Sequence, residues 1–185
     1  YMDAQAIGGL FAAPGPFPIY EALKAAATGA GSLILISNCA GAVLHAKMAL
    51  EMAAEDGVKA KGILLGGTNV ADPYTGRRED RRMGVALFET KMISGYAGLG
   101  HSLDEVIAFG DFVLDNVRAI TIGIRPGTSP STGDVMYDLP DDEITLGAGG
   151  HGEAGADNIP MCTSRELAEK VLEMILNDKP FVPGD

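Results

Sequence analysis

The sequence predicts an α/β fold, in which a sheet with parallel β-α-β units is flanked by helices and followed by part of a smaller α+β domain. The first observation is an order of segments: the apolar runs 32–36 and 58–65 enclose a long helical pattern over 43–56. Two buried strands joined by a helix form a β-α-β unit, whose strands are parallel. The second observation is a change after residue 118, where short strand-like runs are broken by glycine and proline.

This change of pattern predicts a domain boundary near Arg118. We assign residues 1–118 to the α/β domain. Residues 119–185 then form the start of a second, α+β domain that carries His151.

The helices of the first domain follow from turn and cap residues. A helix over 19–27 ends at Thr28-Gly29, since glycine commonly follows a helix C-terminus. Residues 83–98 are helical in pattern, and a further helix begins after Ser102 and runs to about residue 117. Ser102 and Glu105 have the spacing of a capping box, in which each side chain bonds to the backbone of the other residue.

The second domain is predicted to contain short strands and one helix. Strand-like runs lie at 119–124, 135–138 and 143–146. A last helix begins near Thr163 and reaches about Leu176.

A polar loop follows the first apolar run and is a candidate ligand site. The run 32–36 has the composition of a central strand buried on both faces, and the small residues 37–41 follow it. Ligands of open α/β sheets bind at the carboxyl ends of strands. We therefore expect Asn38 and Gly41 to contact substrate, although a role in the turn itself is the alternative.

A second candidate site is the glycine-rich segment 147–155, which contains one histidine, His151, and one glutamate, Glu153. Glycine allows unusual backbone angles and close approach of a ligand, so His151 would be presented there for chemistry. Imidazole can act as base, acid, metal ligand or nucleophile. The alternative is an ordinary glycine turn, and Glu153 either orients His151 or caps that turn.

Composition excludes several classes of function. The chain has 185 residues, 46% of them hydrophobic, and a net charge of −11, which is typical of a globular protein and disfavours nucleic-acid binding. No apolar run approaches the ~20 residues of a membrane helix. The two cysteines favour a reducing, cytoplasmic location, and with the three scattered histidines they predict no metal site.

The ordered motifs resemble the substrate-binding (K) subunit or domain of the dihydroxyacetone kinases. The resemblance covers nearly the whole chain, and the Tyr-Thr-Gly-Arg-Arg and Gly-x-His-Gly-Glu-x-Gly motifs are its most specific parts. The matching segments are, in order, Ala12-Ala13-Pro14-Gly15-Pro16, the strand that ends in Asn38 with Gly41 after it, Tyr74-Thr75-Gly76-Arg77-Arg78, Met83-Gly84-Val85-Ala86, Ser102-Leu103-Asp104-Glu105-Val106 and Gly149-Gly150-His151-Gly152-Glu153-Ala154-Gly155.

The resemblance implies that His151 bonds covalently to the carbonyl carbon of dihydroxyacetone, with Gly150 and Glu153 beside the substrate. It implies a phosphotransferase component of dihydroxyacetone kinase type, which can be inactive on its own. The chain itself would bind no cofactor: the phosphoryl group would come from ATP-Mg or a phosphotransferase-system protein, through a nucleotide-binding L-type subunit or domain. The resemblance also implies a homodimer.

Two departures from the family pattern bear on activity. Ala42 stands where the family usually has an aspartate that deprotonates the substrate hydroxyl, and Ser37 stands where lysine is common. A methyl group cannot act as a general base, whose contribution is typically about 10² to 10⁴ in rate. The family's N-terminal glycine-rich segment, which carries a further histidine, has no counterpart here because the chain starts at Tyr1, downstream of it.

Three functional hypotheses remain open from the sequence. In the first, the chain is the ketose-binding component of a kinase. In the second, it is a catalytically impaired paralogue that senses ketose and regulates a partner, and the absence of the family's aspartate at Ala42 fits this hypothesis. The third is an aldolase-like or other carbonyl enzyme that uses His151 without phosphate. Asp72 and Asp134 are candidates to replace the missing base by charge alone, and the sequence favours neither.

Overall fold

The computed structural model describes residues 2–73, 75–84, 86–149 and 154–182. Contacts divide the chain into two compact units, which are described separately. The first unit comprises Tyr1–Leu65 and Ala86–Val117, and the second comprises Gly66–Val85 and Arg118–Asp185. The contact boundary at 117/118 lies beside the predicted domain boundary, but it adds the segment 66–85 to the second unit. Because contact units need not fold independently, the division into domains stays a prediction.

The first unit contains the predicted β-α-β unit. Strands β1 (Ser32–Ser37) and β2 (Ala60–Leu65) are parallel and in register from Ser32 opposite Ala60 to Ser37 opposite Leu65, and α2 (Ala40–Glu55) joins them. The α/β fold class is thereby confirmed. The remaining helices of this unit are α1 (Pro16–Ala26), α3 (Leu87–Gly98) and α4 (Leu103–Asn116).

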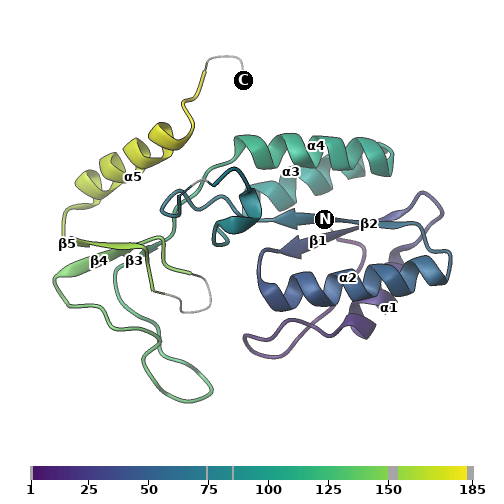
Figure 1. Cartoon of the computed structure of the whole chain (residues 1–185), viewed down its shortest axis with the longest axis horizontal. Coiled ribbons are helices and arrows are strands. Elements are labelled where there is room, and N and C mark those ends of the chain that lie inside the picture. Colours follow the sequence, from purple (N-terminus) through teal and green to yellow (C-terminus); the bar gives the residue numbers. More distant parts are fainter. Residues whose placement is uncertain (1, 74, 85, 150–153, 183–185) are drawn as a thin grey trace. The chain divides into compact units, whose positions relative to one another are not determined.

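Helices cover both faces of this small sheet, with α1 and α2 on one side and α3 and α4 on the other (Figure 1). The side chains of β1 alternate between these faces, as strand geometry requires. Ile34 packs against the α1–α2 cluster, whereas Leu33 and Leu35 pack against the α3–α4 cluster. The buried members of the two clusters are, respectively, Ile19, Tyr20, Leu23, Ala49 and Ala53, and Ile63, Leu65, Ile93, Val106 and Leu114.

Complete burial of β1 was a wrong prediction. Only Ser32 in this strand is buried, residues 33–36 are half-buried, and Ser37 is exposed. Within the described residues the parallel sheet has two strands, so β1 lies at an edge and lacks a neighbour on its outer side.

Helix starts also differ from the sequence-based expectation. The first helix begins at Pro16, because proline is well suited to the first helical position, where its missing N–H costs nothing. Helix α3 begins at Leu87 instead of residue 83, and α2 begins at Ala40 instead of 43. The capping box of α4 is confirmed: the Glu105 carboxylate accepts from the Ser102 N–H at 2.8 Å, and the Ser102 hydroxyl accepts in return.

The second unit contains a three-stranded antiparallel sheet in the order β3 (Ile122–Gly123), β4 (Glu143–Leu146) and β5 (Asp157–Pro160). The amphipathic helix α5 (Ser164–Asp178) packs on this sheet through Leu167 and Met174. A short 3₁₀ helix, η1 (Arg78–Asp80), lies in the segment 66–85.

Three strand predictions in this unit were inaccurate. The run 119–124 contains only β3, because Ala119 pairs instead with Asn69 in an isolated parallel bridge. The run 135–138 forms no strand, and Val135 makes one bridge to Thr128. Strand β5 was missed, since aspartate, asparagine and proline are poor strand formers.

No described helix combines the length and the apolar composition needed to span a membrane.

Candidate functional site

The predicted histidine segment connects two paired strands. Strands β4 and β5 are antiparallel, and Leu146 pairs with Asp157, so residues 147–156 form the connection between them. Three of the candidate site residues, Gly150, His151 and Glu153, lie in this connection and outside the described residues. Both ends of the connection are described, and they show how the segment is held.

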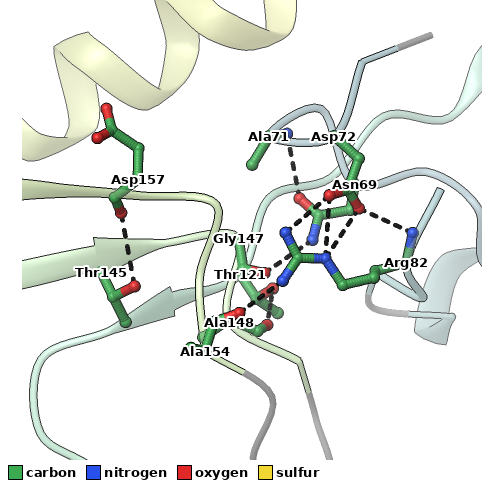
Figure 2. Close-up of polar contacts among 10 residues, drawn as sticks. All are labelled: Asn69, Ala71, Asp72, Arg82, Thr121, Thr145, Gly147, Ala148, Ala154 and Asp157. Carbon is green, nitrogen blue, oxygen red and sulfur yellow. Dashed lines mark hydrogen bonds and ion pairs between the residues drawn. The ribbon is translucent and has the colours of Figure 1, made fainter. Parts of the chain in front are cut away.

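The first end of the connection is held by three hydrogen bonds at Gly147 and Ala148. The Gly147 N–H donates to the Thr121 carbonyl at 2.7 Å, and the Thr121 hydroxyl donates to the Ala148 carbonyl. The Asn69 side-chain N–H donates to the Gly147 carbonyl at 3.2 Å (Figure 2). Gly147 has φ +79°, a left-handed conformation that favours glycine, and a Cβ there would collide with Ala71.

The second end is held at Ala154 and Ala156. The Arg82 guanidinium donates to the Ala154 carbonyl at 2.5 Å, and the Ala156 N–H donates to the Leu146 carbonyl at 2.8 Å. Between them, Gly155 lies so close to the backbone of Leu146 that any side chain would collide with it. Backbone packing therefore requires glycine at this position.

Arg82 is itself oriented by Asp72. The guanidinium donates to the Asp72 carboxylate from Nη2 at 2.7 Å and from Nε at 2.9 Å, and the Arg82 backbone N–H adds a bond of 2.8 Å. Burial raises the pKa of Asp72, but the hydrogen bonds and positive charge of Arg82, with the charge of Arg81, outweigh it and lower this pKa. Asp72 thus accepts bonds from Arg82 and is poorly suited to be the substitute base considered above.

Asn69 is likewise fixed in place. It is completely buried, and its side-chain oxygen accepts from the Ala71 N–H at 3.2 Å. Backbone bonds connect its neighbours to Ala119: Val70 N–H to Ala119 carbonyl at 2.8 Å and Ala119 N–H to Thr68 carbonyl at 2.9 Å. The amide of Asn69 therefore has little freedom to turn away from the Gly147 carbonyl.

A second ionic cluster lies at the end of α5. Asp178 accepts bonds from Arg81, one of them at 3.1 Å, and from Arg118. Arg81 is only 3% exposed, so its charge is compensated within the protein. The hydrogen bonds from Arg81 are the largest cause that lowers the pKa of Asp178; burial opposes them, and Arg118 contributes in the same direction as Arg81.

The other candidate residues lie in the first unit: Asn38 follows β1, and Gly41 lies in the first turn of α2. Asn38 is half-buried and its N–H donates to the Leu65 carbonyl at 3.1 Å. Gly41 lies on α2, which corrects its assignment to the loop, and a Cβ there would make only an ordinary contact with Ala13. Ala42 follows it on the helix and is half-buried. A substrate contact at Asn38 or Gly41 remains a prediction.

The other histidines have structural partners. His45 Nδ1 lies 2.8 Å from the Pro14 carbonyl oxygen, and the His101 ring stacks on Tyr96 with 3.7 Å between ring centroids. Cys39 and Cys162 are free thiols. No group of three potential metal ligands occurs among the residues that the structure describes.

Sequence reasoning identified the histidine segment but missed the residues that hold it. Neither Asn69 nor Arg82 was among the candidate site residues predicted from the sequence. Arg77, by contrast, is exposed and contacts Glu79 at 3.1 Å. An asparagine after two glycines at a strand end was the one available signal for Asn69.

Comparison with known proteins gives a consistent result. The family model of the Dak1 domain matches residues 1–185. The chain is 33% identical over its whole length to the dihydroxyacetone-binding subunit DhaK of PTS-dependent dihydroxyacetone kinase 1 from Listeria innocua, and covers 56% of that protein. It is 29% identical to L-erythrulose kinase of Pectobacterium atrosepticum, across 95% of this chain and 30% of that enzyme. The chain thus spans about half, or less, of these relatives.

Solved structures share the fold. The dihydroxyacetone kinase of C. freundii superposes with a TM-score of 0.84 at 22% identity, over 92% of this chain and 31% of that one. The dihydroxyacetone kinase operon co-activator Dha-DhaQ gives a TM-score of 0.82 at 21% identity, over 92% and 52% of the two chains.

Proposed function

The chain belongs to the Dak1 domain family, and from this premise we propose that it is the ketose-binding component of a dihydroxyacetone-type kinase. His151 captures the ketone covalently, and a nucleotide-binding partner subunit or domain delivers the phosphoryl group. The observation that carries this proposal is the family match over the whole chain, which includes the Gly-x-His-Gly-Glu segment. The working protein is a homodimer in this proposal.

The chemistry needs only a neutral imidazole and a carbonyl. One ring nitrogen of His151 adds to the carbonyl carbon, and the C=O π electrons move to the oxygen. The proton on the other ring nitrogen is released as the oxygen gains one, which gives a neutral hemiaminal. Glycerol has no carbonyl and forms no such adduct. The adduct fixes the terminal hydroxyl in place for phosphoryl transfer, which is a positioning effect.

Native mass spectrometry of the protein with dihydroxyacetone tests the capture step. We expect a mass gain of one dihydroxyacetone molecule, no gain with glycerol, and none in His151→Asn. His101→Asn is the matched control, because His101 stacks on Tyr96 and lies outside the proposed site. Absence of the mass gain in the folded wild-type protein would remove the proposal.

A regulatory paralogue is the second candidate, and Ala42 favours it. The first turn of α2 presents a methyl group where the family usually has its base, so capture without turnover is the expected behaviour of a sensor. Adding ATP-Mg and an L-type subunit of a relative distinguishes the candidates: phosphorylated ketose supports the kinase, and an adduct without product supports the sensor.

Replacement of Ala42 by aspartate extends this test. If residue 42 faces the substrate, Ala42→Asp raises the rate of phosphorylation by up to about 10² to 10⁴. Glu55→Asp, at the far end of the same helix, is the control and should leave the rate unchanged. An unchanged rate in Ala42→Asp would show that this position does not contribute the base.

A further inference from the structure

We propose that Asn69 and Arg82 are positioning residues, which hold the two ends of the β4–β5 connection and so determine how His151 is presented. Neither residue belongs to the connection, and neither was a candidate from the sequence. The functional part of the inference rests on the proposed ketose capture at His151. The structural part, that these two side chains restrain the connection, does not depend on it.

The two side chains act on opposite ends of one segment. Asn69 bonds to the carbonyl of Gly147, before the histidine motif, and Arg82 bonds to the carbonyl of Ala154, near the end of that motif (Figure 2). Both come from the segment 66–85, which precedes the sheet in the chain. One external segment therefore restrains both ends.

Such restraint is needed because the connection is long. Residues 147–156 exceed the roughly two to five residues of most hairpin loops, whose shape the turn itself determines. Longer glycine-rich segments have many accessible backbone conformations, so their position depends on contacts from outside. A nucleophile must lie within a narrow range of distance and angle from the carbonyl carbon, and a displacement of about 1 Å can cost about 10²-fold.

Both donors are oriented before they bond to the connection. The Asn69 amide is completely buried and bonded at its oxygen by the Ala71 N–H. The Arg82 guanidinium bonds the Asp72 carboxylate through two nitrogens, which leaves Nη1 directed at Ala154. A planar guanidinium can bond both partners at once, whereas a lysine ammonium is a single point charge on a flexible stem. The geometry therefore specifies arginine.

Hydrogen exchange measured by mass spectrometry tests the restraint in the intact chain. We expect Arg82→Lys and Asn69→Ala to raise exchange in peptides that cover 147–156 by about 10-fold, which corresponds to the loss of about one hydrogen bond. Peptides from β4 and α5 should be unchanged. Arg77→Lys is the matched control, because Arg77 lies in the same segment but pairs with exposed Glu79.

Ketose affinity gives the functional readout. Arg82→Lys should weaken dihydroxyacetone binding by about 10- to 100-fold, while the urea midpoint shifts little and Arg77→Lys binds normally. A residue with a purely structural role would lower the midpoint without a selective loss of affinity. Unchanged exchange in folded Arg82→Lys and Asn69→Ala overturns the proposal.

The outcomes separate this inference from the proposed function. If the wild-type protein binds no ketose, the proposed ketose-binding function is removed. Raised exchange in the variants would still support the restraint of the connection. Normal ketose binding by variants with raised exchange overturns the positioning role. General unfolding of even Arg82→Lys also overturns it, since Arg82 would then hold the whole unit and not the connection.

Discussion

The two units of this chain differ in the contacts that stabilise each of them internally. In the first unit, apolar side chains from four helices cover both faces of a two-stranded sheet, in two clusters that include Ala49 and Ile93. In the second, the apolar cluster of the small sheet is supplemented by partly buried ion pairs centred on Asp72 and Asp178 and by glycines packed against backbone.

This difference matters because the two kinds of contact differ in directionality. Apolar packing is nondirectional, so a core tolerates changes that preserve volume. Hydrogen bonds and ion pairs require defined distances and angles, and a buried group that loses its partner costs more than the bond contributed. The second unit carries the histidine segment, and directional contacts suit a region that must hold one backbone in one place.

The largest expected effect comes from the buried ion cluster of the second unit. Asp178→Asn removes the carboxylate that pairs with both Arg81 and Arg118, and we expect a loss of about 3–5 kcal/mol in the free energy of unfolding. Asp104→Asn is the matched control in the first unit, where the partner Lys61 and the carboxylate are both exposed, and the urea midpoint should hardly move. Equal effects of the two substitutions would contradict the contrast between the units.

Two glycines with left-handed backbones provide the next comparison. Gly57 in the first unit has φ +71°, and a Cβ added there would meet no other atom within 4 Å, so Gly57→Ala should cost about 1–2 kcal/mol, from conformation alone. Gly147 has φ +79° and faces Ala71, so Gly147→Ala should cost at least about 1 kcal/mol more. Chemical denaturation of both variants measures the difference, which would vanish if the packing at Gly147 were loose.

Acid should weaken the second unit before the first. The pKa of Asp72 and that of Asp178 are lower in the folded protein than the ordinary aspartate value of about 3.9, so their contribution to stability is present above about pH 4. It is lost as the pH falls through the lowered values. Hydrogen exchange, corrected for its intrinsic pH dependence, should show β4 and β5 opening first, and Asp178→Asn should reduce this acid sensitivity.

The smallest expected effects come from two substitutions of similar cost in stability, only one of which should also change ketose affinity. Ile93→Val in the first unit removes one buried methylene and should cost about 0.5–1.5 kcal/mol without changing ketose affinity. Thr121→Val removes the hydroxyl that donates to Ala148 and should cost about 1 kcal/mol, while it also weakens ketose binding. If Thr121→Val bound dihydroxyacetone as wild type does, the bonds at the first end of the connection would be irrelevant to capture.

The sequence alone determined the local elements and the family. The alternation of apolar runs with a helical pattern predicted the parallel pairing of β1 and β2, and Ser102 with Glu105 predicted a real capping box. These features depend on residues close together in the chain, and periodicity and cap chemistry act over that range. The motif around His151 could be recognised for the same reason, because its residues are also close together in the chain.

Only the tertiary structure decided what holds that segment. Asn69 and Gly147 lie 78 positions apart, and Arg82 and Ala154 lie 72 apart. The ion pair of Arg81 with Asp178, at the end of α5, likewise joins residues 97 positions apart. No local pattern connects such pairs, because a basic run such as Arg81-Arg82 resembles solvated surface until the fold places acidic partners beside it. The shortening of the strand predicted at 119–124 has the same cause, since Ala119 pairs with Asn69 from a distant part of the chain.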